Sequence, residues 1–197
     1  MTLNERKLIK RSMKGDIDAF EKLIEAHQKS AYNIALRMLK NPEDAKDVSQ
    51  QAFVKIFKYI DTFNFKSSFT TWMYRIIVNL CIDYINKNKI NNTYSLDNPI
   101  KTDTGEINRE VKDNTDLPED IVEKKETKQI VHNAINKLDD IHRSIIILRD
   151  IEDFSYKEIS EILEISIGTV KSRIKRGRDN LRVILKEEME QNPWNSV

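Results

Sequence analysis

The chain contains 197 residues, of which 39% are hydrophobic and 33% are charged, and its formal net charge at pH 7 is +1. This length suits one large domain or two small ones, each with a modest core. No apolar run approaches the roughly 20 residues of a membrane-spanning helix, and the first residues lack the apolar segment of a signal peptide, so we expect a cytoplasmic protein with no membrane insertion. The single cysteine, Cys81, excludes an intramolecular disulfide and a multi-cysteine zinc site.

Four glycines, four prolines and the lack of alternating β-branched runs predict an all-α fold. The sequence also contains no glycine-rich loop for a phosphate, no cluster of metal ligands and no nucleophile beside a base. We therefore expect no cofactor, no metal, no small-molecule substrate and no enzymatic activity.

The first part of the chain predicts three helices in succession. A short helix over residues 3–13 is broken at Gly15-Asp16, and a longer one with a core-facing stripe follows to about residue 40. Asn41-Pro42 then provides a cap and a first-turn proline for a helix that runs to about residue 60. We expect this third helix to bury Ala45, Val48, Ala52, Ile56 and Tyr59.

The third helix has more apolar surface than one core-facing stripe requires. Phe53, Val54 and Phe57 widen the stripe, while Asp47, Gln50 and Gln51 lie elsewhere on its surface. Such a widened stripe indicates either a partner surface or additional core. The residues alone leave both alternatives open.

A connector, Asp61 to Ser68, carries aromatic residues among polar ones. Phe63 and Phe65 could stack on unpaired bases while Lys66 meets a phosphate. Ser67 or Ser68 caps the next helix, for which we expect a core side consisting of Phe69, Trp72, Met73, Ile76, Leu80 and Tyr84. A polar stripe of Thr71, Arg75, Asn79 and Asp83 runs beside it. A tryptophan in such a stripe is more often core than a stacking platform, and a buried Asn79 would need hydrogen-bond partners.

The helical pattern stops after about residue 90. From Asn91 to Asp120 eight acidic residues face three basic ones, and this net charge of −5 with two prolines and one glycine predicts a flexible acidic linker. A second helical domain follows, with one helix over about 118–138 and another that Asp139-Asp140 caps.

Residues 154–178 predict a helix-turn-helix. Ser155 and Glu158 form a capping box, Glu164-Ile165-Ser166 is a short turn, and Ser166 can cap the second helix. Val170, Ile174 and Leu181 share one side of that helix, with Gly177 as a close-packing point.

The second helix of this motif is basic although the whole chain is nearly neutral. Six basic residues and two acidic ones between Glu164 and Arg182 give a net charge of +4. A solvated helix face would account for such a run, but capping, turn length, apolar spacing and charge together favour DNA binding in the major groove. The residues expected to approach phosphates and base edges are Gly168, Lys171, Ser172, Arg173, Lys175 and Arg176.

Four stretches, in this order, resemble the extracytoplasmic-function (ECF) family of bacterial RNA polymerase sigma factors. They are Gly15-Asp16 with Ala19-Phe20, Asp44 to Phe53, Phe69 to Asn79 with Asp83, and Gly168 to Arg173. The resemblance covers nearly the whole chain. It implies a factor that binds core RNA polymerase, recognises the −35 and −10 promoter elements and helps to open the duplex.

The resemblance also assigns residues to these partners. Core polymerase, through its β′ clamp, would meet Asp47, Gln50, Gln51 and Phe53, and the β flap is a second expected contact. The unpaired −10 strand would meet Phe63, Asn64, Phe65, Lys66, Trp72, Arg75 and Asn79. The polar face of the second helix in the helix-turn-helix, from Gly168 to Arg176, would contact the −35 element. An anti-sigma protein would hold the two domains in a closed arrangement.

The expected organisation is therefore two small helical domains joined by the acidic linker. Residues 1–90 form sigma region 2, 91–117 the linker, 118–188 sigma region 4 as a four-helix domain, and 189–197 a tail. Two rival functions remain on the residues alone. A dimeric repressor would bind a palindrome without polymerase, and a helical adaptor that binds an acidic protein would show no preference for any DNA sequence.

Overall fold

The computed structural model describes residues 2–94 and 118–190, and all the regular structure in these ranges is helical. The expected all-α fold is therefore confirmed, whereas most of the predicted linker and most of the tail lie outside the described residues. In chain order the elements are α1 (Leu3–Ser12), α2 (Ile17–Leu39), α3 (Pro42–Tyr59), η1 (Ile60–Thr62), α4 (Phe69–Tyr94), α5 (Pro118–Lys137), α6 (Asp140–Ile146), η2 (Ile147–Ile151), α7 (Tyr156–Leu163) and α8 (Ile167–Glu190). Within these ranges no helix combines the length and the apolar character needed to cross a membrane.

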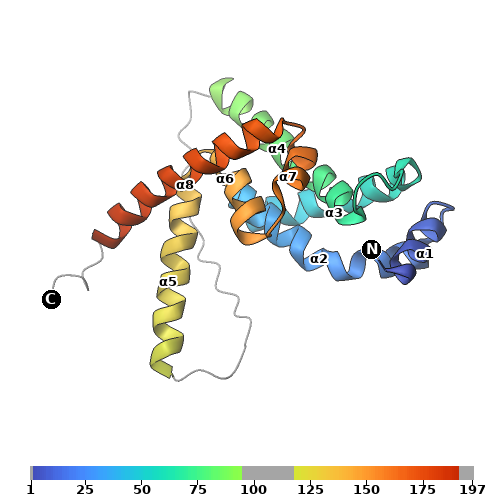
Figure 1. Cartoon of the computed structure of the whole chain (residues 1–197), viewed down its shortest axis with the longest axis horizontal. Coiled ribbons are helices and arrows are strands. Elements are labelled where there is room, and N and C mark those ends of the chain that lie inside the picture. The colour runs from blue at the N-terminus through green and yellow to red at the C-terminus, as the bar shows by residue number, and fades with distance from the viewer. Residues whose placement is uncertain (1, 95–117, 191–197) are drawn as a thin grey trace.

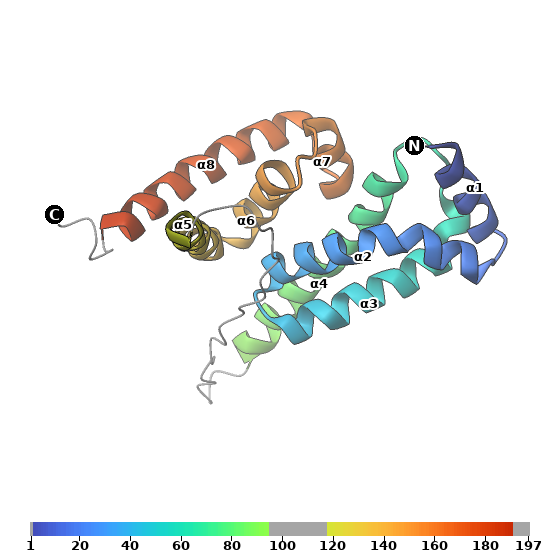
Figure 2. The ribbon, with the colours of Figure 1, turned by 90° about the horizontal axis from the view of Figure 1, so that it is seen from below.

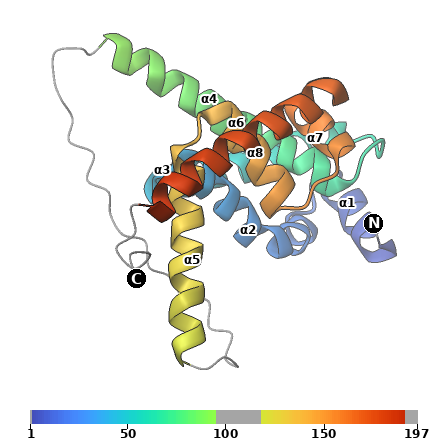
Figure 3. The same ribbon diagram turned by 60° about the vertical axis from the view of Figure 1, so that its left-hand side comes forward.

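Helices α1–α4 form one helical body and α5–α8 form another (Figures 1 and 2). In the first body α2 packs against α1, α3 and α4, and in the second α8 packs against α5, α6 and α7. The second body thus contains the four predicted helices, with the π-helical segment η2 between α6 and α7. Figures 1 and 3 show α5 projecting from the rest of the molecule.

Local capping chemistry explains where most helices begin. The Asp16 carboxylate accepts a hydrogen bond from the Ala19 amide at 3.0 Å, and the Asn41 amide oxygen accepts from Glu43 and Asp44. Ser68 Oγ accepts from the Thr71 amide at 2.9 Å, so Ser68 is the cap of α4. The Asp139 carboxylate does the same for α6.

The core of the first body follows the predicted stripes with two differences. Tyr59 is 42% exposed, so the expectation that α3 buries it is wrong. On α4 the fully buried positions are Phe69, Met73, Ile77, Val78 and Cys81, whereas the expected core residues Trp72, Ile76, Leu80 and Tyr84 are only half-buried. Cys81 is confirmed as a small buried hydrophobic residue, and its burial raises the thiol pKa to about 12.

Gly177 is a close-packing point, as predicted. A Cβ at this position would lie 3.0 Å from Cγ1 and 3.2 Å from Cδ1 of Ile146, which is itself buried in the core. Gly177→Ala gains about 1 kcal/mol of helix propensity but overpacks this contact at a cost of about 1–3 kcal/mol.

We therefore expect Gly177→Ala to lower the free energy of unfolding by roughly 1 kcal/mol, as measured by urea denaturation. Gly168→Ala is the matched control on the same helix, because its Cβ would meet only Ser166 Oγ at 3.7 Å. That control should unfold like the wild type or at slightly higher urea. A Gly177→Ala protein as stable as the wild type would contradict the predicted clash.

Candidate nucleic-acid interface

The helix-turn-helix has the predicted caps and turn. In α7 the Glu158 amide donates to Ser155 Oγ at 3.3 Å while Glu158 Oε2 accepts from the Ser155 amide at 2.9 Å, which completes the capping box. Glu164 ends α7 in the left-handed conformation with φ +53°. Ser166 Oγ then accepts from the Thr169 amide at 3.1 Å, so α8 begins at Ile167.

The start of α8 exposes one polar face. Val170, Ile174 and Gly177 are buried against the second body, which fixes the rotation of the helix. Of the residues predicted for the −35 element, five are exposed and Arg173 is half-buried; the exposed ones are Gly168, Lys171, Ser172, Lys175 and Arg176. The structure therefore places these donors together on the solvent side of a helix with a defined start. That arrangement suits a helix lying in a major groove.

Arg178 differs from these cations because it already has a partner. Its guanidinium pairs with the Asp150 carboxylate through Nη2 at 2.5 Å and Nε at 3.2 Å. The hydrogen bond to Asp150 raises the pKa of Arg178 above the ordinary value for arginine. Arg178 therefore ties α8 to η2 and lies at the edge of the group predicted for the −35 element.

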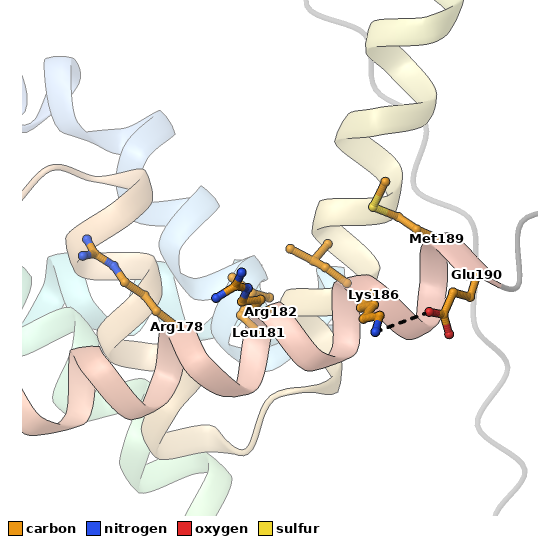
Figure 4. Close-up of a pocket in the computed structure, with 7 residues that line it drawn as sticks. Arg178, Leu181, Arg182, Lys186, Met189 and Glu190 are labelled. Atoms are coloured by element: carbon orange, nitrogen blue, oxygen red, sulfur yellow. Dashed lines mark ion pairs between the residues drawn. The ribbon is translucent and has the colours of Figure 1, made fainter. Parts of the chain in front are cut away.

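A groove lies further along α8, beyond the residues predicted for the −35 element (Figure 4). Its lining combines the apolar Leu181, Leu185 and Met189 with charged neighbours, and Lys186 pairs with Glu190 at 3.7 Å. Figure 4 shows the groove beside α5. Its lining, from Arg178 to Glu190, follows the predicted −35 residues in sequence.

The loop between η1 and α4 has one buried aromatic residue and one at its surface. Phe63 is 2% exposed and packs against Phe65 and Trp72, with ring centroids 4.8 and 5.5 Å away. Phe65 is half-buried and adopts φ +60°. Asn64 and Lys66 are exposed, and the Asn64 side chain accepts a hydrogen bond from the Lys66 amide at 3.1 Å. Phe63 thus supports the loop from the core, while the other three residues form its surface.

The predicted −10 residues on α4 lie against the helix-turn-helix. Arg75 pairs with Glu164 at 3.2 Å, and Thr71, which is 2% exposed, donates to Glu158 at 3.4 Å. Trp72 and Asn79 are half-buried. The polar stripe of α4 is therefore occupied in part by acidic residues of the other helical body.

This contact belongs to a larger interface between the two bodies. Helix α4 packs on α7, and the Tyr74 ring meets the Phe154 ring edge-on at a centroid distance of 5.3 Å. Arg37 of α2 pairs with Glu152 at 2.8 Å. We call this the closed arrangement, and in it Arg75, one of the residues predicted for the −10 strand, is paired with Glu164.

The predicted polymerase-binding residues lie on the outer side of α3. Asp47, Gln50 and Gln51 are exposed and Phe53 is half-buried. Val54 is 71% exposed, and with Phe53 and Phe57 it lines a surface hollow shared with the start of α2. The widened apolar stripe is thus only partly absorbed into the core and leaves an apolar patch at the surface.

Helix α1 has a basic face that was not predicted from the sequence. Five exposed cations, Arg6, Lys7, Lys10, Arg11 and Lys14, recur at intervals of three or four residues. Leu3–Lys14 has one acidic residue, Glu5, and a net charge of +4, so a local charge count could have identified it.

Two family models match this chain, one in each of the two helical bodies. The sigma-70 region 2 model matches residues 23–90, and the sigma-70 region 4 model matches residues 128–181. The chain is 39% identical over 188 residues to the ECF RNA polymerase sigma factor SigW of Bacillus subtilis, covering 95% of this chain and all of the relative. It is 33% identical over 177 residues to the ECF RNA polymerase sigma-E factor of Escherichia coli K12, covering 90% and 92% of the two chains.

Two solved structures have the same fold. CnrH in complex with the cytosolic domain of CnrY has a TM-score of 0.65 at 24% identity over 93% of this chain and 98% of the solved one. The sigma factor RpoE of Bartonella quintana, in complex with the anti-sigma factor NepR, has a TM-score of 0.68 at 24% identity, covering 85% and 96%. The sequence relationship to SigW and the two matched sigma regions, which span most of the chain, decide the family. The chain belongs to the extracytoplasmic-function family of bacterial RNA polymerase sigma factors.

Proposed function

We propose that this chain binds core RNA polymerase and directs it to promoters by recognising their −35 and −10 elements and helping to open the duplex. The observation that carries the proposal is the exposed donor face at the start of α8, which lies on a capped helix-turn-helix within a chain related to ECF sigma factors along nearly its full length. The chain itself performs no chemistry in this account. Its binding energy positions the polymerase and offsets the cost of melting DNA.

At the −35 element α8 would lie in the major groove. Lys171, Lys175 and Arg176 are exposed on one side of the helix and can reach phosphates and base edges. Gly168 is exposed near the helix start, where the absence of a side chain lets the DNA backbone approach closely. Arg173, which is half-buried, is placed at the margin of this face.

At the −10 element the loop over residues 63–66 would hold an unpaired base. Phe65 offers a partly exposed ring and Asn64 an exposed amide, while Phe63 fixes the loop from below. Flipping a base costs a few kcal/mol, which base stacking and hydrogen bonds can offset. Trp72, Arg75 and Asn79 on α4 would guide the same strand once the closed arrangement opens.

Core polymerase would bind the outer surface of α3. The exposed polar residues Asp47, Gln50 and Gln51 lie on the turns of α3 that precede Phe53 and the exposed Val54. An apolar patch with a polar rim is the usual composition of a protein interface. The β′ clamp is the expected partner at this surface, and the β flap is a second contact of the chain.

An anti-sigma protein is the expected regulator in the cytoplasm. The related structures of CnrH and RpoE were solved with CnrY and NepR, of which NepR is an anti-sigma factor. Here Arg75 of α4 pairs with Glu164 and Thr71 is buried beside Glu158, so opening of the closed arrangement would free this part of α4 for DNA. A partner that stabilises this arrangement would therefore keep the factor inactive.

We expect Arg176→Ala to weaken binding of the polymerase holoenzyme to a −35-containing duplex by about 1–3 kcal/mol if Arg176 makes a bidentate base contact. Competition binding against a −35-scrambled duplex measures this. Lys186→Ala is the matched control, because Lys186 is also an exposed cation on α8 but lies beyond the predicted face. Unchanged specific affinity for Arg176→Ala would remove it from the interface. Tight binding of the free chain to a palindrome would instead favour a repressor.

We expect Val54→Asp to weaken binding to core polymerase by about 2 kcal/mol, because it places a charge in the apolar part of the proposed interface. Val54 is 71% exposed, so folding should be unaffected. Lys55→Ala changes the charge by the same amount at the neighbouring exposed position and serves as the control. Titration of labelled protein with core polymerase gives both affinities, and equal values would place the β′ contact elsewhere.

A further inference from the structure

The basic face of α1, defined by Arg6, Lys7, Lys10, Arg11 and Lys14, is a built surface with a fixed orientation. Ile9 and Ser12 on the opposite side are 0% and 1% exposed, which fixes the rotation of the helix. All five cations line one shallow groove together with Leu3.

Three of these cations remain available to a partner. Arg11 is engaged by Asp16 at 2.6 Å. Lys7, Lys10 and Lys14 are exposed, and within the described residues none of them has an ion pair. A row of unneutralised positive charge of this kind favours a polyanion.

The position of α1 indicates which polyanion. The Arg6 guanidinium lies 5.5 Å from the centroid of the Phe65 ring, so the basic face begins at the loop proposed to hold the unpaired −10 base. Helix α1 also contacts η1, and Figures 1 and 2 show it beside that loop. A strand with a base in the loop must continue past one side of it, and α1 occupies one of these sides.

The length of the face suits a short run of nucleotides. Ten helical residues span about 15 Å, which corresponds to roughly four phosphates at the 3.4 Å rise of a stacked strand. Lysines on such a face would hold the backbone without reading the bases, since phosphate contacts position a nucleic acid and do not specify its sequence.

We propose that the basic face of α1 binds the phosphate backbone of the unpaired promoter strand next to the base held by residues 63–66. This inference rests on the proposed function of that loop. To the function of the loop, the inference adds a contact with the DNA backbone that does not depend on base sequence. Arg6 connects the loop to the basic face, because its guanidinium lies over the Phe65 ring.

The test uses holoenzyme reconstituted with core polymerase and fork-junction DNA that carries the −10 strand unpaired. One probe ends at the −10 element, and others extend the unpaired strand by four nucleotides on either side. The variant is Lys7→Ala/Lys10→Ala/Lys14→Ala, which leaves Arg6 on Phe65 and Arg11 on Asp16. The control, Lys29→Ala/Lys128→Ala/Lys186→Ala, removes the same charge from exposed positions on α2, α5 and α8.

We expect the α1 variant to lose about tenfold or more in affinity for one extended probe, whatever the base sequence of the extension, and to keep wild-type affinity for the short probe. For the extended probe, the slope of the logarithm of the binding constant against the logarithm of the salt concentration should become shallower by about 2. This is the change expected for the loss of three phosphate contacts on a single strand. The control should behave like the wild type.

Two results would overturn the inference and leave the proposed function of the loop intact. One is an unchanged affinity and salt slope on both extended probes. The other is a loss of core polymerase binding with normal DNA binding, which would make the face a contact for an acidic surface of the enzyme. Failure of the wild-type holoenzyme to retain even the short −10 probe would overturn the proposed function of the loop together with this inference, so the two failures are distinguishable.

Discussion

Arg143→Ala is expected to lower the free energy of unfolding by roughly 3 kcal/mol, the largest single effect on stability that we anticipate. Arg143 is 4% exposed, and its guanidinium donates to the Met38 carbonyl at 2.8 Å and the Leu138 carbonyl at 3.1 Å while it also pairs with Asp140. Removing it leaves two buried carbonyls without this donor. In the variant Asp140 still pairs with Lys89, 2.5 Å away. The expected loss in the free energy of unfolding is therefore near the lower end of the range for breaking a buried ion pair.

Urea denaturation of the full chain measures this effect, with Arg11→Ala as the control. Arg11 makes a comparable ion pair with Asp16, but its side chain is 51% exposed, and such surface pairs contribute about 0–1 kcal/mol. If Arg143→Ala and Arg11→Ala lowered the free energy of unfolding equally, the burial of Arg143 would not explain its contribution to stability. Because Met38 belongs to α2 and Arg143 to α6, the variant should also loosen the closed arrangement.

Arg37→Glu is expected to open the closed arrangement, shifting its equilibrium by roughly 2 kcal/mol or about thirtyfold. It replaces the Arg37–Glu152 pair, 2.8 Å apart, with two facing carboxylates. The Glu152 side chain is only 16% exposed, so the repulsion is poorly screened. Opening frees Arg75 from Glu164, and the free chain should then bind a −10 single-strand oligonucleotide more tightly and have a larger radius of gyration.

The charge swap Arg37→Glu/Glu152→Arg is the matched control, since it restores an opposite-charge pair and should return both values toward wild type. Lowering the pH offers a second check. Burial raises the pKa of Glu152, with Arg37 opposing this shift, so protonation of its carboxyl favours the closed arrangement. The Arg37→Glu protein should therefore close again as the pH falls toward about 4.3, the ordinary glutamate value. An Arg37→Glu protein as compact as the wild type at neutral pH would contradict this account.

The parts of the fold that the sequence predicted depend on local chemistry. Asn41, Ser155, Asp139 and Ser166 cap helices as expected, because a cap requires only a side-chain oxygen close to free amide groups. The rotation of α8 was also predictable, since its apolar residues repeat with the helical period. These features together predicted that the residues proposed for the −35 element lie on the outside of the second body, where the structure has them exposed apart from the half-buried Arg173.

The features that escaped prediction depend on contacts distant in sequence. Arg75 meets Glu164 and Thr71 meets Glu158 across 89 and 87 positions, and no local pattern indicates such partners. Phe63 was predicted as a base-contacting residue because it lies in a polar connector. Its burial results from Phe69 and Trp72 on the following helix, which enclose the ring. Tyr59 is the last residue of α3 and is exposed there, although it continues the apolar stripe of the helix.

The most direct test of the central claim is run-off transcription over a library of genomic promoters, using core RNA polymerase from the bacterium that carries this chain. We predict transcripts from a defined promoter set that appear only when the chain is added, with shared −35 and −10 sequences upstream of their start sites. Absence of any stimulation, with core polymerase shown to be active on a nicked template, would contradict the account.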